Sequence, residues 1–187
     1  SLGCNMLKEC DILDEKVKIL RKKSEKVTFP LSKEDKKLIN EAIDYLRKSQ
    51  DEEYAKKYDI RGGMGLALVQ LGVLKRIFVI SYKHEDGHFE EYTVINPKMI
   101  SHSEELIYVE EGEGCLSVNR EVEGIVPRYA RVTVEYYDIN GQKTETRARE
   151  EIAVAFQHEI DHLDGILFVD KIDKKNPFKN KDMMRPI

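Results

Sequence analysis

Two histidines and a glutamate stand at a spacing that can bind and use a metal ion. His158, Glu159 and His162 form the pattern H-E-x-x-H. Residues four apart lie on the same face of a helix, so the two imidazoles can share one ion. The carboxylate of Glu159 can then take a proton from a metal-bound water, because the ion lowers the pKa of that water toward neutrality. The pattern also occurs by chance in surface helices, so it needs support from the rest of the chain.

A hydrolytic site of this kind needs a third protein ligand and an open position for water. The long histidine motif of one metalloprotease class is excluded, because its third histidine would fall on Phe168. A glutamate from a later helix is excluded as well, since no glutamate follows His162. The strongest upstream candidate is Cys115, whose thiolate would complete a ligand set suited to Zn or Fe(II). Taken by itself, Cys115 could equally be a buried, inert cysteine.

Two carboxylates near these residues each have two interpretations. Asp161 either orients a ligand histidine or is an exposed aspartate of the helix. Glu113 either pairs with an arginine near the site or faces water. The three other histidines lie in polar segments that link strands, where we expect surface residues: His84, His88 and His102.

The helix that must carry the motif is indicated by the spacing of its apolar residues. They recur at helical intervals: Ile152, Ala155, Phe156, Ile160 and Leu163. Acidic residues at the start and Gly165 after the end predict a helix over 150–164. The same reasoning predicts a helix over 32–49 with Ser32 as its N-cap.

Short apolar and β-branched runs predict strands in the rest of the chain. We expect them over 76–83 and near 91–96, 105–109, 122–126, 131–138 and 142–149. The sequence Asn140-Gly141 predicts a tight hairpin between the last two. This order predicts an α+β fold in which antiparallel β-sheets pack around a central metal-binding helix. We expect a single domain over 1–187, with an extended C-terminal tail over 174–187 and a possible cloning remnant over 1–5.

Charge and cysteine usage limit the partners and the location. Lys and Arg number 31 against 35 Asp and Glu, and no basic block stands out along the chain, so DNA is not an expected partner. The three cysteines, Cys4, Cys10 and Cys115, are too scattered for a disulfide framework. No run is apolar enough to cross a bilayer. A cytoplasmic location and no membrane partner are therefore expected.

Three separated segments resemble the peptide deformylase family. They are G-M-G-L-A-L-V-Q over 63–70, E-G-C-L-S over 113–117 and H-E-I-D-H over 158–162. The similarity runs through most of the chain, and the loop before Gly63 resembles the branch found in many Gram-positive bacteria and mollicutes. The resemblance implies a metal-dependent hydrolase that removes the N-formyl group from the formyl-methionine of newly made polypeptides and releases formate.

The resemblance also implies a role for each matching residue of the metal site. Cys115, His158 and His162 would bind one divalent ion, and Glu159 would act as general base and then as general acid. By analogy the ion is Fe(II) in the cell, while Zn, Ni or Co can be present in preparations. Oxidation of the thiolate ligand is a liability of such a site.

Further roles implied by the resemblance concern the substrate. Gln70 and the backbone N–H of Leu116 would stabilise the oxyanion. Met64 and Gly65 would contact the formyl-methionyl nascent peptide, with Gly65 allowing the substrate backbone to approach as an added strand. The family also implies a transient visit to the ribosome.

The first motif departs from the family where Leu68 and Val69 stand in place of the usual alanine and proline. This difference motivates one alternative, a deformylase-like protein that binds its ligand with reduced or no turnover. A second alternative, based on H-E-x-x-H alone, is a metallopeptidase that cleaves internal peptide bonds. A third is a structural metal site, although such sites usually have a fourth protein ligand and none is evident in the sequence.

Overall fold

The structure is a computed structural model, and it describes residues 6–187. The expectation about residues 1–5 therefore lies outside the described residues. Within the described range, no helix combines the length and the apolar character needed to cross a bilayer.

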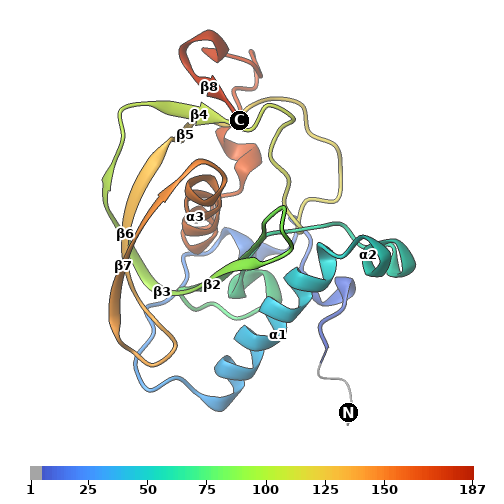
Figure 1. Cartoon of the computed structure of the whole chain (residues 1–187), viewed down its shortest axis with the longest axis vertical. Helices are drawn as coiled ribbons and strands as arrows, with labels where there is room; N and C mark the ends of the chain where they lie inside the picture. Colours follow the sequence, from blue (N-terminus) through green and yellow to red (C-terminus); the bar gives the residue numbers. More distant parts are fainter. Residues whose placement is uncertain (1–5) are drawn as a thin grey trace.

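A five-stranded antiparallel sheet forms the largest part of the fold (Figure 1). Its strand order is β1-β2-β3-β6-β7. The strands are β1 (Gly65–Ala67), β2 (Ile77–Lys83), β3 (Phe89–His102), β6 (Arg131–Tyr137) and β7 (Lys143–Arg149). The predicted antiparallel α+β arrangement is confirmed, and the strand expected near 91–96 is part of the longer β3.

Strand β2 is buried on both faces, which explains its continuous apolar sequence. Successive side chains of a strand point to opposite faces. Phe78 and Ile80 belong to the cluster that includes Phe156 of the last long helix. Ile77 and Val79 belong to the cluster on the opposite face. The sheet therefore lies between two apolar layers.

Two long helices supply these layers, as Figure 1 shows. Helix α1 (Lys33–Ser49) packs against β1 and β2, and its N-cap Ser32 accepts a hydrogen bond from the Asp35 backbone N–H. Helix α3 (Glu150–Leu163) packs against β1, β2 and β7, within the curve of the sheet. Both helices confirm the ranges expected from the sequence.

Shorter elements complete the chain, and the sequence did not predict them. Helix α2 (Glu52–Tyr58) follows α1 directly and is capped by Asp51. Single 3₁₀ turns occur at Glu9–Asp11, Lys18–Arg21, Leu68–Leu71, Phe168–Lys171 and Lys181–Met183.

A small second sheet includes the end of the C-terminal tail. It contains β5 (Arg128–Tyr129), β4 (Leu106–Tyr108) and β8 (Arg185–Pro186) in that order. Strand β8 pairs in parallel with β4, and the backbone N–H of Ile187 donates to the carbonyl of Tyr108 at 2.9 Å. The last residues of the tail are therefore an extended strand that completes a sheet edge.

The prediction of a strand near 122–126 is wrong, because these residues form a loop. Gly124 has φ of +127°, which is incompatible with a regular strand of L-residues. Val126 packs with Phe168, and the Ile125 backbone N–H bonds to the carbonyl of Pro177 at 3.0 Å. The apolar residues of this segment are thus buried by loop packing, which sequence periodicity does not distinguish from a short strand.

Candidate metal centre

Cys115, His158 and His162 come together at one buried point. One possible ligand atom from each lies within 4.8 Å of the others. The Sγ of Cys115 is 3.3 Å from Nε2 of His162. His158 and His162 lie one turn apart on α3, whereas Cys115 lies in the loop that follows β4. A thiolate and two imidazoles in this arrangement fit a Zn or Fe(II) ion.

The ring of His158 is oriented by a buried carboxylate. Its Nδ1 lies 2.9 Å from Oε1 of Glu113, so Nε2 is left for a ligand. Glu113 also receives two hydrogen bonds from the guanidinium of Arg128, at 2.8 and 2.9 Å. Arg128 in turn donates to Asp161 at 2.8 Å. Glu113 is therefore the carboxylate that orients a histidine of the cluster. Asp161 instead accepts a hydrogen bond from Arg128.

The charges in this network are strongly coupled. Burial acts to raise the pKa of Glu113, but hydrogen bonds from Arg128 and His158 outweigh it and lower the pKa to about 2. Burial acts to lower the pKa of His158, yet hydrogen bonds with Cys115 and Glu113 raise it well above its usual value. Burial and the nearby positive charges of His158 and Arg128 lower the pKa of His162. His162 is thus favoured in the neutral form that binds metals.

Glu159 lies beside the cluster with its carboxylate buried. The residue is 3% exposed, and burial raises the pKa of Glu159 to about 7. Its Oε1 has no hydrogen-bond partner among the described residues. A carboxyl group with a pKa near neutrality can both accept and donate a proton at physiological pH.

The glycines of the first motif are placed close to these groups. A Cβ on Gly65 would lie 2.5 Å from Oε2 of Glu159, and one on Gly63 would lie 2.7 Å from the side chain of Leu116. At such distances the side chain of Glu159 or Leu116 would have to shift. Glycine at the two positions therefore leaves the side chains of Glu159 and Leu116 undisturbed where the backbone passes close to them.

A cavity of about 410 Å³ opens onto the cluster. Met64, Gly65 and Leu116 line it, together with the metal-centre residues Cys115, His158 and Glu159. Its apolar wall is formed by Val109, Val154 and Ala155. The cavity thus joins an apolar surface to the polar cluster, as expected for a site that binds a side chain beside a reacting group.

Gln70 is buried next to the cluster. Its Oε1 accepts a hydrogen bond from the Ala67 backbone at 2.9 Å. Its Nε2 donates to Oγ of Ser117 at 3.0 Å and lies 3.6 Å from Sγ of Cys115. The amide N–H groups therefore point toward the metal centre.

The unusual residues Leu68 and Val69 are fully buried. Leu68 packs in the cluster with α1, and Val69 packs in the cluster with Phe156 of α3. Neither residue is among those that line the cavity. Their larger side chains therefore fill the core on either side of the sheet rather than narrowing the cavity.

Sequence reasoning missed Arg61 as a residue of the site. Its guanidinium donates to the carbonyls of Val118 at 2.8 Å and Leu116 at 3.2 Å, and to Oδ1 of Asn119 at 2.6 Å. It is also 3.4 Å from the carbonyl of Cys115. Arg61 therefore links two loops by hydrogen bonds: the glycine loop, which it precedes, and the loop that contains Cys115. In the sequence, the only indication that Arg61 belongs to the site was its position just before the glycines.

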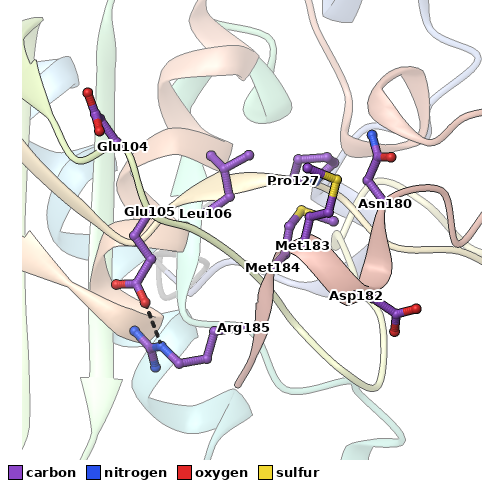
Figure 2. A pocket seen from close by; sticks show the side chains of 9 residues that line it. All are labelled: Glu104, Glu105, Leu106, Pro127, Asn180, Asp182, Met183, Met184 and Arg185. Carbon is purple, nitrogen blue, oxygen red and sulfur yellow. Dashed lines mark hydrogen bonds and ion pairs between the residues drawn. The ribbon is translucent and has the colours of Figure 1, made fainter.

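A second hollow, of about 540 Å³, lies between the segment before β4 and the C-terminal tail. Figure 2 shows its lining, with the ion pair between Glu105 and Arg185 on one side and Met183 and Met184 on another. None of the cluster residues lines it. Its carboxylates belong to no group of three that could hold a metal ion among the described residues.

Comparisons with known proteins agree with this geometry. The family model described as "Polypeptide deformylase" matches residues 10–178. A "Peptide deformylase 2" from Bacillus cereus is 46% identical over 182 residues, covering 97% of this chain and 99% of the relative. A peptide deformylase from Listeria welshimeri is 48% identical over 172 residues, covering 92% and 94% of the two chains.

Solved structures give the same result. The peptide deformylase from Thermotoga maritima superposes with a TM-score of 0.69 at 32% identity, covering 90% of this chain and 98% of that one. A plant peptide deformylase superposes with a TM-score of 0.74 at 27% identity, covering 92% and 85%.

Proposed function

The chain belongs to the peptide deformylase family, in the branch of its Gram-positive relatives. From this premise we propose which residue performs each part of the reaction. The protein is a metal-dependent hydrolase that removes the N-formyl group from newly made polypeptides. The proposal concerns the residues that perform this reaction, the resident ion and the setting in which the protein acts.

Cys115, His158 and His162 hold the ion, with Glu113 orienting His158. The support is that one ligand atom from each of the three lies within 4.8 Å of the others, which is the single observation that carries the proposal. When bound, the ion supplies a Lewis acid that activates water and polarises the formyl carbonyl. The resident ion is Fe(II), and Zn, Ni or Co can replace it.

Glu159 moves the proton. As a carboxylate it takes the proton from the attacking water, and as a carboxylic acid it gives that proton to the leaving amine of the methionine. The pKa of about 7, which results from burial, supports both steps. The unpartnered Oε1 of Glu159 is the atom available for this exchange.

Gln70 and the backbone N–H of Leu116 stabilise the negative charge that develops on the formyl oxygen. Loss of one such donor typically costs about 100-fold or more in kcat. Met64 contacts the methionine side chain, and the apolar wall that contains Val154 supports it. Gly65 contacts the backbone of the peptide, where a side chain would meet Glu159.

The setting follows from the substrate. The partner is the formyl-methionyl nascent peptide. The protein acts in the cytoplasm and binds the ribosome transiently. Its chain forms one catalytic domain. The scattered cysteines of the sequence favour a reducing compartment.

The test is product analysis with protein purified without oxygen. A formyl-methionyl peptide is incubated with the protein, and formate and the peptide masses are measured. We expect loss of the formyl group with the chain intact. Cleavage of internal peptide bonds would support a metallopeptidase instead, and metal-loaded protein that releases no formate would support a silent binding protein.

A further inference from the structure

One face of helix α3 forms a wall of the cavity at the metal centre. The α3 residues that line the cavity recur at intervals of three and four, which is the spacing of one helix face: Glu151, Val154, Ala155, His158 and Glu159. Glu151 stands at the end of this row that is distant from the metal centre. Seven positions separate it from His158, or about 10 Å along the helix axis. The cavity wall therefore runs from the metal centre, over an apolar segment, to a carboxylate.

The side chain of Glu151 has no ion-pair or hydrogen-bond partner within residues 6–187. The preceding Glu150 is paired with Arg185 instead. The other acids of the cavity lining differ from Glu151, because Glu113 belongs to a buried ion pair and Glu159 is itself buried. Glu151 is exposed, so its carboxylate can contact a molecule that enters the cavity.

Two arginines are candidates to neutralise Glu151, and neither does so. Arg61 also lines the cavity, but its guanidinium donates to carbonyl groups of the loop that contains Cys115. Arg149 lies two positions before Glu151 in the sequence and forms no ion pair with it. The negative charge of Glu151 is therefore left for a ligand.

The surroundings of Glu151 are also negatively charged. Burial is the main cause that raises the pKa of Tyr82 on β2, and the charges of Glu151, Glu85 and Glu90 raise it further. Two more acids, at 110–111, are exposed and lie in the chain between residues that line the cavity. A cleft bordered by charges of one sign attracts ligands of the opposite sign. This end of the cavity is therefore suited to a cation.

The length of the cavity wall indicates a cationic side chain of the substrate itself. In the proposed function the formyl group reacts at the metal centre, and the methionine side chain lies on the apolar segment of Val154 and Ala155. An extended peptide advances about 3.3 Å per residue, so about 10 Å corresponds to about three residues. The long side chain of a lysine or arginine shortly after the methionine can therefore reach Glu151. A metal ion fits less well there, because Glu151 belongs to no group of three possible metal ligands among the described residues.

We propose that Glu151 is a specificity-determining residue that favours formyl-methionyl peptides with lysine or arginine at one of the two positions after methionine. This role rests on the proposed function and names the substrates that the same site prefers. A structural role is the simple alternative, because an acid in the first turn stabilises a helix. Glu34 is the matched residue for that role. It is the second residue of α1, as Glu151 is of α3, and it is exposed and does not line the cavity.

The test compares kcat/KM for formate release from short peptides that differ in one side chain. Formyl-methionyl-lysyl-alanine and formyl-methionyl-alanyl-lysine are each compared with the peptide that has glutamine in place of lysine. We expect the wild type to prefer at least one lysine peptide by about three- to fivefold at low salt, mainly through KM. The preference should shrink at high salt, because salt screens an exposed pair. Glu151→Gln should abolish the preference, whereas Glu34→Gln should keep it.

Charge reversal separates specificity from a general loss of activity. Glu151→Lys should reverse the preference, so that a peptide with glutamate at the same position is favoured over the lysine peptide. Equal kcat/KM for the lysine and glutamine peptides in the wild type, with formate released from all of them, would overturn the role of Glu151 and leave the proposed function standing. A preference that persists in Glu151→Gln would do the same. Release of no formate from any peptide would overturn both.

Discussion

Glu113 connects His158, one of the three proposed metal ligands, to the buried cation of Arg128. One of its oxygens contacts both Nδ1 of His158 and the guanidinium of Arg128, each at 2.9 Å. The side chains of Arg128 and Glu113 are 2% and 4% exposed, so the pair is almost fully removed from water. Groups that orient a ligand histidine influence metal affinity although they do not touch the ion.

Glu113→Gln should weaken both the fold and the metal site. Removing one partner of a buried ion pair typically costs about 3–5 kcal/mol, because the other charge remains buried. The loss of the carboxylate on His158 should lower metal affinity by about 10- to 100-fold. Urea unfolding and titration with Zn measure the two effects. The exposed Glu53→Gln serves as control, and equal effects of the two substitutions would contradict this account of Glu113.

Because of the same carboxylate, the free energy of unfolding depends on pH in the acid range. The pKa of Glu113 is about 2 in the folded protein against 4.5 as its ordinary value. Its contribution is therefore fully present above pH 4.5 and is lost as the pH falls through about 2. Unfolding of the metal-free protein, followed from pH 5 to pH 2, should show a smaller dependence on pH for Glu113→Gln than for the wild type. Identical curves would rule out this contribution.

Gly65→Ala should impair catalysis more than stability. The added Cβ would lie 2.5 Å from the carboxylate of Glu159, which must shift to make room. A displacement of about 1 Å in a reacting group can cost about 100-fold in rate. Gly114→Ala is the matched control, because a Cβ there meets nothing within 4 Å. We expect kcat to fall sharply only for Gly65→Ala; equal kcat in the two variants would show that Gly65 does not protect the position of Glu159.

At the scale of elements, the long periodic segments were predictable from the sequence and the short ones were not. Helix α1 buries one apolar stripe, whereas α3 is buried on all sides over 152–159; in both helices the large apolar residues recur at helical spacing, which is what periodicity detects. The loop over 122–126 carries similar apolar residues, but it buries them against Phe168 without pairing to a strand. Strand β8 has only two residues, and its partner β4 lies far away in the sequence. No local pattern can reveal a pairing of that kind.

Strand β8 leads to a residue that supports the cavity wall. Ile187 packs against the cluster of Ile107, Ala130 and Val154, and Val154 lines the cavity of the metal centre. Ile187→Asp should therefore raise KM for a formyl-methionyl peptide several-fold and lower the unfolding free energy by about 1–2 kcal/mol. Met183→Asp in the same tail should change neither, because Met183 is 80% exposed. An unchanged KM in Ile187→Asp would show that the C-terminal tail does not affect substrate binding.

At the scale of the whole molecule, the three proposed metal ligands come together because the fold joins distant segments. Cys115 precedes His162 by 47 positions and reaches it through the packing of the β4 loop on α3. The spacing of H-E-x-x-H predicted that the two histidines share a helix face, and elimination together with the resemblance indicated Cys115. Glu113 orients His158, and Arg61 links the glycine loop to the loop that contains Cys115. Both contacts depend on side-chain directions that only the folded chain defines.

The measurement that tests the account most directly compares wild-type protein with Glu159→Ala, both purified without oxygen. Metal content and formate release from a formyl-methionyl peptide are determined on the same samples. We predict that both proteins bind one ion, and that Glu159→Ala releases formate about 100-fold or more slowly. The account would be contradicted if the metal-loaded variant released formate at the wild-type rate.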